Sequence, residues 1–377
     1  MDFINPISKK EIIMYKKFII VALLGLLLTG NIITVHASED MSPPVQSQLD
    51  QSKAQSELKQ ELSKIIGSSK NLSSLQQKMI AELIFQLSFN RYSQFAWNML
   101  GWGEVSTAGP DGAIKQEGYD WFKRIKKSKK SLIVKDWGYL LSYTKLSADY
   151  IDHQSDKTVI IQHGYRGPVT GMAAQAKMFY EMGYNVLMPH ARGTGRSEGL
   201  YINFGWREKD DIISWINSVP SEQDVILMGE SMGAATMMMV SGEKLPSHVK
   251  AIIEDCGYAS LEQQLENVFD LLNSLSDTPL PKSILDYVYK DVQSKLKFNV
   301  KDASALNQVK KSTLPMLFIH GDQDILVSPK FVYDLYESKV NGYKDLMVVE
   351  GANHVQSISF GYEHYRDKII DFLEKAK

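Results

Sequence analysis

Hydrophobic and polar residues follow a regular pattern from residue 131 to the end of the chain. Short continuous apolar runs indicate buried strands, and they alternate with longer segments whose apolar residues recur at helical spacing. Two segments around Gly138 predict an antiparallel pair of strands. The other predicted strands lie within the segments 158–164, 184–190, 224–231, 249–257, 314–324 and 345–354, where each strand runs into a turn or loop. The predicted helices are 172–183, 208–219, 232–245, 329–339 and 364–376.

This order of elements predicts the fold class. Strands that are apolar along their whole length need helices on both faces of their sheet, and a helix between two consecutive strands makes them parallel. We therefore expect an α/β fold with a doubly wound, mostly parallel sheet. Functional sites of such sheets lie at the carboxyl ends of the strands.

One segment, residues 259–312, interrupts the alternation. Within it, residues 261–275 and 284–298 have the spacing of amphipathic helices, and the sequence DTPLP separates them. A helical insertion at the carboxyl edge of such a sheet commonly forms a lid over the site. A longer crossover without a role at the site is the alternative.

The first 130 residues have a different pattern. Residues 1–37 contain a basic segment, an apolar run and the sequence VHA, in the order of a secretory signal. The apolar part, 18–35, is also just long enough for an uncleaved membrane anchor. Either interpretation places the protein outside the cytoplasm, extracellular or anchored and facing outside. Residues 38–130 predict a polar extension with a helix over 75–100, and the α/β domain would then be 131–377.

The composition excludes several classes of function. The chain has 377 residues, 44% of them hydrophobic, and a net charge of −2, so we expect a globular protein that does not bind nucleic acid. Cys256 is the one cysteine, and no Cys/His cluster has zinc spacing, so we expect no disulfide, metal or cofactor. The basic segment 123–130 favours a solvated turn over a patch for membrane or cell wall. We also expect that the N-terminus associates with the membrane or the cell wall.

Two segments match the pattern G-x-S-x-G, which marks the strained strand-to-helix turn of a serine nucleophile. They are GRSEG at 195–199 and GESMG at 229–233. Only the second follows a predicted strand and precedes a predicted helix, which is the arrangement that exposes the hydroxyl and leaves the next N–H free. We therefore predict that Ser231 is the nucleophile and Ser197 a structural loop residue.

A serine nucleophile needs a base and an acidic residue that orients the base. His354 lies in GANH, after the last predicted strand and at the same edge as Ser231, so we predict that it is the general base. Asp324 follows a predicted strand and precedes His354 by 30 residues, which is room for one helix and one strand. It is the preferred third residue, and Asp255 and Asp322 are the alternatives.

The oxyanion formed during acyl transfer needs two backbone donors. The N–H of Met232, directly after the serine, is the first candidate. The second is the N–H of Tyr165, because Gly164 allows a sharp turn in the loop HGYRG, which follows the apolar strand TVIIQ. The side chains of Tyr165, Arg166 and His190 are candidates for substrate binding, although we expect Arg166 at the surface rather than on a substrate carboxylate.

Five motifs occur in one order along the chain: QHGYRG, HARGTGRSEG, GESMG, HGDQD and GANH. In these motifs the chain from about residue 131 resembles the α/β-hydrolase superfamily, in particular its bacterial serine aminopeptidase-like, dipeptidyl-peptidase-like and small carboxylesterase members. The resemblance implies that GRSEG is a structural loop. His190 departs from the family, which most often has aspartate there.

These observations predict an exported serine hydrolase that cleaves a carboxylic ester. A serine peptidase acting on short peptides is the alternative, and it would need acidic lid residues for a free N-terminus, for which Glu262, Glu266 and Asp270 are available. A non-catalytic binding module on the same fold is an alternative of another class.

Overall fold

The structure, a computed structural model, describes residues 72–94, 97, 109–136, 143–274 and 279–376. The predicted signal or anchor, residues 1–37, lies outside this part of the chain, as does most of the glycine-rich segment 101–112. None of the helices in the described part is long and apolar enough to cross a membrane.

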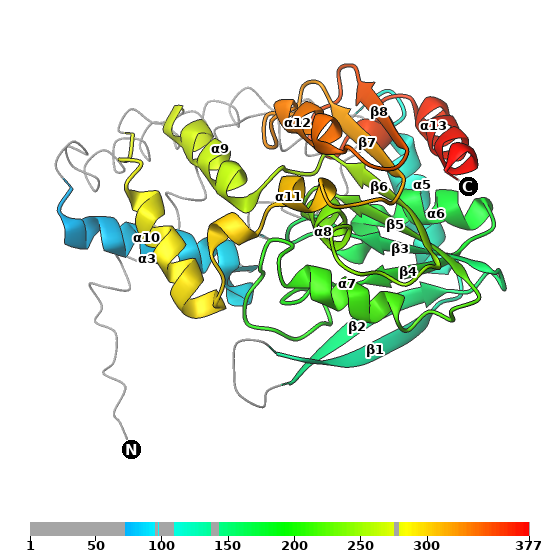
Figure 1. Ribbon diagram of the computed structural model, residues 1–377, viewed down its shortest axis with the longest axis horizontal. Helices are drawn as coiled ribbons and strands as arrows, with labels where there is room; N and C mark the ends of the chain where they lie inside the picture. Colours follow the sequence, from blue (N-terminus) through cyan, green and yellow to red (C-terminus); the bar gives the residue numbers. More distant parts are fainter. Residues whose placement is uncertain (1–71, 95–96, 98–108, 137–142, 275–278, 377) are drawn as a thin grey trace, which may run out of the picture.

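Eight strands form one sheet in the order β1-β2-β4-β3-β5-β6-β7-β8 (Figure 1). β1 pairs antiparallel with β2, and β2 with β4, whereas all the pairs from β4 through β3 to β8 are parallel. The predicted mostly parallel sheet is therefore confirmed. The strands are β1 (Ser128–Lys135), β2 (Tyr143–Ile151), β3 (Lys157–Gln162), β4 (Asn185–Pro189), β5 (Asp224–Glu230), β6 (Val249–Asp255), β7 (Met316–Gly321) and β8 (Lys344–Val349).

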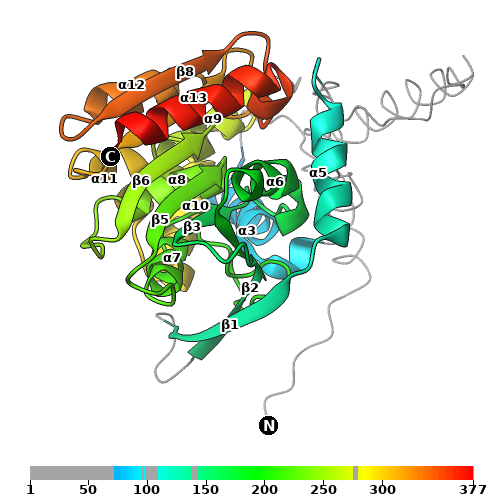
Figure 2. The same cartoon turned by 90° about the vertical axis from the view of Figure 1, so that its right-hand side faces the viewer.

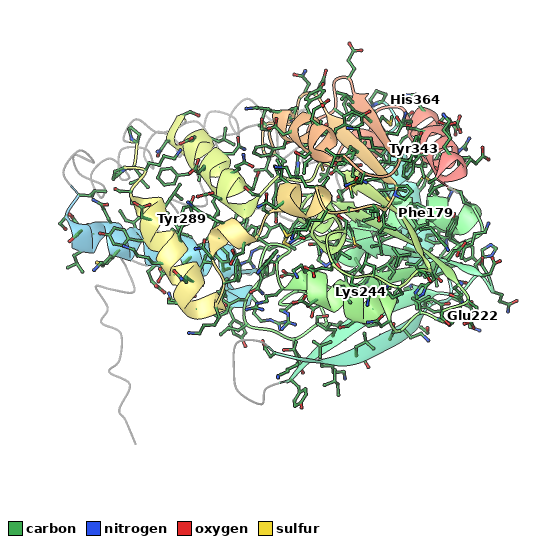
Figure 3. All side chains as sticks on the ribbon, viewed as in Figure 1. Phe179, Glu222, Lys244, Tyr289, Tyr343 and His364 are labelled. Atoms are coloured by element: carbon green, nitrogen blue, oxygen red, sulfur yellow. The ribbon has the colours of Figure 1, made fainter. Side chains whose placement is uncertain are left out.

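Helices cover both faces of the sheet and make two hydrophobic cores (Figures 1 and 2). One core includes α7 (Glu208–Ile216), α8 (Met232–Val240) and α12 (Lys330–Ser338). The other includes α6 (Ala173–Glu181) and α13 (Tyr362–Lys375), and Phe179 of α6 is fully buried in it (Figure 3). The doubly wound arrangement follows, because each face of the apolar strands needs such a cover.

The N-terminal extension joins both cores. Its helix α3 (Ser74–Phe89) begins at a capping box between Ser73 and Gln76 and buries Phe85 in the first core. Its helix α5 (Ala113–Arg124) buries Phe122 in the second core and packs beside α6 (Figure 2). Residue 130, the predicted boundary between the extension and the α/β domain, is therefore not a boundary between separate hydrophobic cores, because the extension contributes residues to both cores.

The basic segment 123–130 contains the solvated connection that its composition favours, together with parts of two elements. Its first two residues end α5, residues 125–127 connect the two elements, and its last three, from Ser128, begin the edge strand β1. The lysines of that strand are exposed. Charged side chains on an edge strand discourage pairing with other chains, which explains why so basic a sequence can be a strand.

The insertion between β6 and β7 is helical, as its pattern predicts. It contains α9 (Leu261–Ser274), α10 (Ile284–Asp291), one π-helical turn (Val292–Leu296), one 3-10 turn (Val300–Asp302) and α11 (Ala305–Val309). α10 packs against α3, and both lie beyond the sheet (Figure 1). α11 packs against α8, so the insertion is attached to the helix that follows the serine.

Candidate active site

The turn between β5 and α8 holds Ser231 in a strained conformation. Its φ is 56° and its ψ is −120°, a region that non-glycine residues rarely adopt. The glycines on either side make this turn possible, because a Cβ at Gly233 would lie 2.1 Å from the carbonyl oxygen of Gln162, and one at Gly229 would lie 2.3 Å from the carbonyl carbon of Gly233. The two glycines of the G-x-S-x-G pattern thus mark two positions where a neighbouring backbone segment leaves no space for a side chain.

Ser231, His354 and Asp324 form a continuous chain of hydrogen bonds. The Ser231 hydroxyl lies 2.9 Å from Nε2 of His354, and Nδ1 of His354 lies 2.7 Å from a carboxylate oxygen of Asp324. An ionised carboxylate only accepts, so Nδ1 carries the proton and Nε2 is left to accept from the serine. The three predicted residues are thereby brought together in the order that general-base activation requires.

Asp324 is held as a carboxylate. It is buried, and one oxygen accepts hydrogen bonds from the backbone N–H groups of Leu326 and Val327 at 2.9 and 2.8 Å. The other accepts from His354 and lies 3.2 Å from Nε2 of His320. Burial opposes ionisation, but the charge of His354 and the hydrogen bonds from both histidines outweigh it and hold the pKa of Asp324 well below its usual range.

Negative charge around His354 favours its protonated form. Burial alone would lower the pKa of His354, but Asp324, Glu230 and Asp255 together raise it above its ordinary value of 6.5. Burial also raises the pKa of Glu230, the residue before the serine, to about 7. The imidazolium that forms when His354 takes a proton is therefore stabilised by its surroundings.

The alternatives for the acidic residue have other partners. The carboxylate of Asp255 accepts from the Ser357 hydroxyl at 2.7 Å and the Tyr365 hydroxyl at 3.0 Å. Asp322 accepts from the N–H of Gly351 at 2.8 Å, which ties two turns together. Of the three candidates, the described contacts join only Asp324 to the histidine.

Ser197, in the second G-x-S-x-G segment, is buried and bonded to backbone. Its hydroxyl donates to the carbonyl of His190 at 2.7 Å and accepts from the N–H of Ser147 at 2.9 Å. It therefore connects the loop after β4 to β2, which agrees with a structural role.

The loop after β3 runs directly beside the serine. A Cβ at Gly164 would lie 3.3 Å from the Cβ of Ser231, so the next residue, Tyr165, begins at the edge of the site. His163 fixes the loop from behind, because its Nδ1 donates to the Gly164 carbonyl at 2.8 Å and its Nε2 accepts from Ala191 N–H at 3.0 Å. Burial lowers the pKa of His163 to about 4, so it stays neutral in this role. The N–H of Met232 begins α8, where helical N–H groups have no partner within the helix.

The side chains of Tyr165 and Arg166 form hydrogen bonds with the N-terminal extension and, in the part of the chain that the structure describes, do not line an exposed pocket. The Tyr165 hydroxyl donates to the carbonyl of Ser88 at 2.7 Å. The Arg166 guanidinium donates to the carbonyls of Leu87, Ser88 and Asn90 at 3.1, 3.3 and 2.8 Å, at the carboxyl end of α3. The expected surface position of Arg166 is wrong: the residue is 3% exposed, because its cation satisfies the last carbonyls of a helix and their dipole.

His190 is also placed away from its predicted role. It is buried after β4, and its Nε2 lies 3.4 Å from a carboxylate oxygen of Asp149, which also pairs with Arg196 at 2.8 Å. None of its described contacts is with Ser231, His354 or Asp324. It belongs to a charged cluster between β2 and the loop after β4.

The insertion contacts the loop that carries Asp324. Gln264 and Asn267 of α9 both donate to the carbonyl of Leu326, at 3.0 and 2.9 Å. The N–H of Val327 belongs to the same peptide unit as this carbonyl and donates to Asp324, so one peptide unit links α9 to the acidic residue. The insertion therefore touches the site at the side of the acidic residue.

Sequence reasoning missed three polar residues close to these loops. Nε2 of His320 contacts the Val327 carbonyl at 3.0 Å and lies 3.2 Å from the Asp324 carboxylate. Glu230 places a buried carboxyl beside the serine, and Lys115 of α5 donates to the carbonyl of Val355. Glu230 lies inside GESMG, where a charged residue before the serine was a visible signal. Lys115 is far away in the sequence, and no pattern marks it.

One cluster has the atoms of a metal site. Cys256, Asp324 and His354 offer ligand atoms that lie within 4.8 Å of one another. Two of them are already bonded to each other, and burial raises the pKa of the Cys256 thiol well above its usual range, which disfavours the thiolate that a metal binds. The arrangement fits acid–base chemistry better than metal binding.

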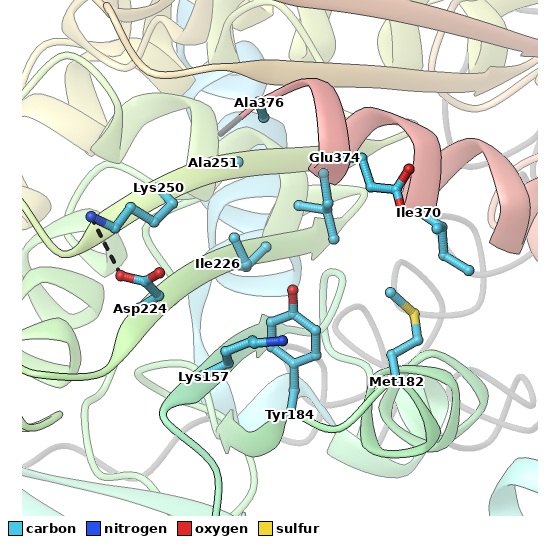
Figure 4. A pocket seen from close by; sticks show the side chains of 11 residues that line it. Lys157, Met182, Tyr184, Asp224, Ile226, Lys250, Ala251, Ile370, Glu374 and Ala376 are labelled. Carbon is cyan, nitrogen blue, oxygen red and sulfur yellow. Dashed lines mark ion pairs between the residues drawn. The ribbon is translucent and has the colours of Figure 1, made fainter.

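A cavity of about 570 Å³ lies elsewhere, at the amino ends of β3, β5 and β6 and beside the end of α13 (Figure 4). Its rim includes Asp224 and Lys250, which form an ion pair at 3.3 Å. Ser231 and His354 follow the carboxyl ends of their strands, so this cavity is at the opposite edge of the sheet from them.

The chain is similar to several known proteins. The family described as "Serine aminopeptidase, S33" matches residues 153–302. The uncharacterized protein YqkD of Bacillus subtilis is 28% identical over 268 residues, which cover 69% of this chain and 86% of the relative. A monoglyceride lipase of Rattus norvegicus is 26% identical over 193 residues, which cover 43% of this chain and 63% of the relative.

A solved esterase structure from Pyrococcus furiosus is also similar. It has a TM-score of 0.51 and 26% identity, and the match covers 66% of this chain and 91% of the esterase. Together with the strand order, these findings show that the chain belongs to the α/β-hydrolase superfamily. It is a hydrolase of the type that includes esterases, lipases and serine aminopeptidases.

The Arg166 contacts lead to a stability prediction. Changing Arg166 to Met removes the charged hydrogen bonds to the carbonyls at the end of α3. Hydrogen bonds from a buried charged group contribute more than neutral ones, so we expect the free energy of unfolding to fall by about 1.5–3 kcal/mol. Urea denaturation would measure the change. Arg366→Met removes only exposed ion pairs on α13 and serves as the control, with no measurable change expected. Equal stability of the two variants would contradict the assigned role of Arg166.

Proposed function

We propose that this protein is an exported serine hydrolase that cleaves carboxylic esters through an acyl-enzyme. The observation that carries the proposal is the hydrogen-bonded chain from Ser231 through His354 to Asp324, which has a buried carboxylate at one end and a strained serine at the other. Superfamily membership supports the same chemistry, because esterases and lipases are among the similar proteins.

In the proposed mechanism, Ser231 Oγ attacks the ester carbonyl carbon while Nε2 of His354 takes its proton. The N–H groups of Met232 and Tyr165 hold the resulting oxyanion. His354 then gives the proton to the departing alcohol, which leaves an ester between the acyl group and Ser231. A water attacks this ester while His354 takes its proton; the bond from the acyl carbon to Ser231 Oγ then breaks, Oγ receives the proton from His354, and the acid is released. Asp324 keeps the imidazole oriented throughout.

The acidic residues of the insertion favour an ester over a peptide with a free N-terminus. The carboxylates of Glu266 and Asp270 lie 3.3 and 3.6 Å from Nζ of Lys282, and that of Glu262 lies 3.7 Å from Nζ of Lys301. Each already has a cation close by, so binding the ammonium group of a peptide would require these pairs to separate. A serine aminopeptidase remains the second candidate, supported by the family that matches residues 153–302.

The proposal of export rests on residues 1–37, with their basic segment, apolar run and VHA sequence. The substrate would then be an extracellular small ester. The same N-terminus would attach the protein to the membrane or cell wall if it is retained as an anchor.

A fluorophosphonate probe tests the nucleophile. Wild-type protein comprising residues 38–377 should form one adduct, on Ser231, and Ser231→Ala should form none. Ser197→Ala is the matched control from the other G-x-S-x-G segment and should still be labelled. Mass spectrometry of the digested protein locates the adduct. An unlabelled but folded wild-type protein would favour the non-catalytic binding module.

The bond class requires substrates that are not activated, because serine peptidases also cleave activated aryl esters. We expect kcat/KM for a short alkyl ester to exceed that for an aminoacyl anilide, since the acidic residues of α9 are paired with lysine. Steady-state kinetics on both substrates measures the ratio. Preference for the anilide, lost on changing Glu266 to Gln, would establish the peptidase instead.

The raised pKa of His354 predicts the pH dependence. Only the neutral imidazole accepts a proton, so kcat/KM should fall as the pH is lowered, with its midpoint above 6.5; Asp324 stays ionised throughout this range. Glu230→Gln removes a negative charge that favours the imidazolium, so it should move this midpoint to lower pH. The exposed Glu222, at the other edge of the sheet, supplies the control Glu222→Gln (Figure 3). An identical midpoint in the wild type and Glu230→Gln would contradict the assignment.

A further inference from the structure

The loop after His354 is held in an unfavourable backbone conformation. Val355, which follows the histidine directly, has a φ of 57°. This left-handed region is costly for a β-branched residue, whose Cβ crowds the neighbouring backbone. Such a conformation persists only where surrounding contacts maintain it. The position of the His354 ring depends on this residue, because the two share a peptide unit.

One contact to the backbone of Val355 comes from the N-terminal extension. Lys115, on the first turn of α5, is 7% exposed, and its ammonium donates to the carbonyl oxygen of Val355. A cation at the amino end of a helix opposes the helix dipole, and a buried ammonium loses its hydration. Both costs indicate that the charge is stabilised by what it faces.

Two buried carboxyl groups near the triad feel the charge of Lys115. They are Glu230 on β5 and Asp255 on β6. Tyr365 of α13 and Ser357 donate to Asp255, and Gln175 of α6 donates to Glu230 at 3.2 Å. Cys256, His320 and Asp324 are the other titratable groups around this cluster. Lys115 is therefore the one cation, among the described contacts here, that reaches both the His354 loop and the carboxyls next to Ser231.

Residues close to Lys115 in the sequence fix the position of α5 against α13 and α6. The carboxylate of Asp111 accepts from the N–H groups of Gly361 and Tyr362 at 3.0 and 2.8 Å, which caps the start of α13. The N–H of Asp111 donates to the carbonyl of Ser359 at 2.9 Å. On the other side, a Cβ at Gly118 would lie 2.5 Å from the backbone of Ala174, so α5 sits directly on α6 (Figure 2). These contacts fix the position of α5, and α5 in turn places Lys115 next to the carbonyl of Val355.

We propose that Lys115 is a positioning residue for the active site, because its bond to the Val355 carbonyl holds the strained turn that presents His354 to Ser231. This inference rests on the proposed function. Misplacing a reacting group by about 1 Å costs on the order of a hundred-fold in rate, so even a small relaxation of this turn would be measurable. The extension would then be a part of the catalytic domain rather than an appendage.

The test is a double-mutant cycle on the chain of residues 38–377. Lys115→Met should lower kcat for the ester substrate on the order of ten-fold or more, with little change in KM, because the loss concerns the base and not the binding of substrate. Lys115→Arg keeps a cationic donor and should recover part of kcat. Lys123→Met changes an exposed lysine on the same helix and should match the wild type.

The second arm of the cycle uses Val355→Asn, because asparagine adopts the left-handed conformation at lower cost. In this background Lys115→Met should reduce kcat much less than it does in the wild type. If the single variant Lys115→Met does not fold, the double variant with Val355→Asn provides the protein for the measurement. Equal losses of kcat in both backgrounds, or a lower melting temperature with unchanged kcat, would overturn the inference. A wild-type protein that no fluorophosphonate labels would instead overturn the proposed function, so the two failures are distinguishable.

Discussion

The close approach of α8 to the end of β3 is the constraint on which the candidate site depends. The carbonyl oxygen of Gln162 leaves no room for a side chain at Gly233, and Gly233 leaves none at Gly229. The helix can therefore sit directly against the sheet, and Ser231 between the two glycines must take a positive φ. Both β5 and α8 are buried, so their packing maintains a turn that would not persist in an isolated peptide.

Segments outside the central sheet then hold the loops around that turn. Arg166, next to the predicted oxyanion donor, is bonded to the end of α3. The carbonyl of Leu326, in the Asp324 loop, accepts from α9, and the carbonyl of Val355 accepts from Lys115 on α5. In each case a polar side chain satisfies a backbone carbonyl near the site. The extension and the insertion therefore contribute to the geometry of the site as well as to the cores.

Much of this arrangement could be predicted from local patterns. Apolar runs located the parallel strands, because their two-faced burial leaves a continuous signal. The strand-to-helix requirement distinguished Ser231 from Ser197, and position at the sheet edge selected His354. Asp324 could only be preferred over Asp255 and Asp322, because all three occur near strand ends. The exposure of Arg166 was mispredicted, since an isolated arginine in a loop shows no sign that a helix end 70 to 80 residues earlier will receive it.

The sequence by itself determined the elements, their order and the edge at which the chemistry is expected, because each depends on residues that are neighbours along the chain. Only the tertiary structure decided which carboxylate meets His354 and where Tyr165, Arg166 and His190 point. It also brought Lys115 to a carbonyl 240 residues away. These contacts join segments whose separation leaves no periodic or local signal, and they form only when the two cores pack against the sheet.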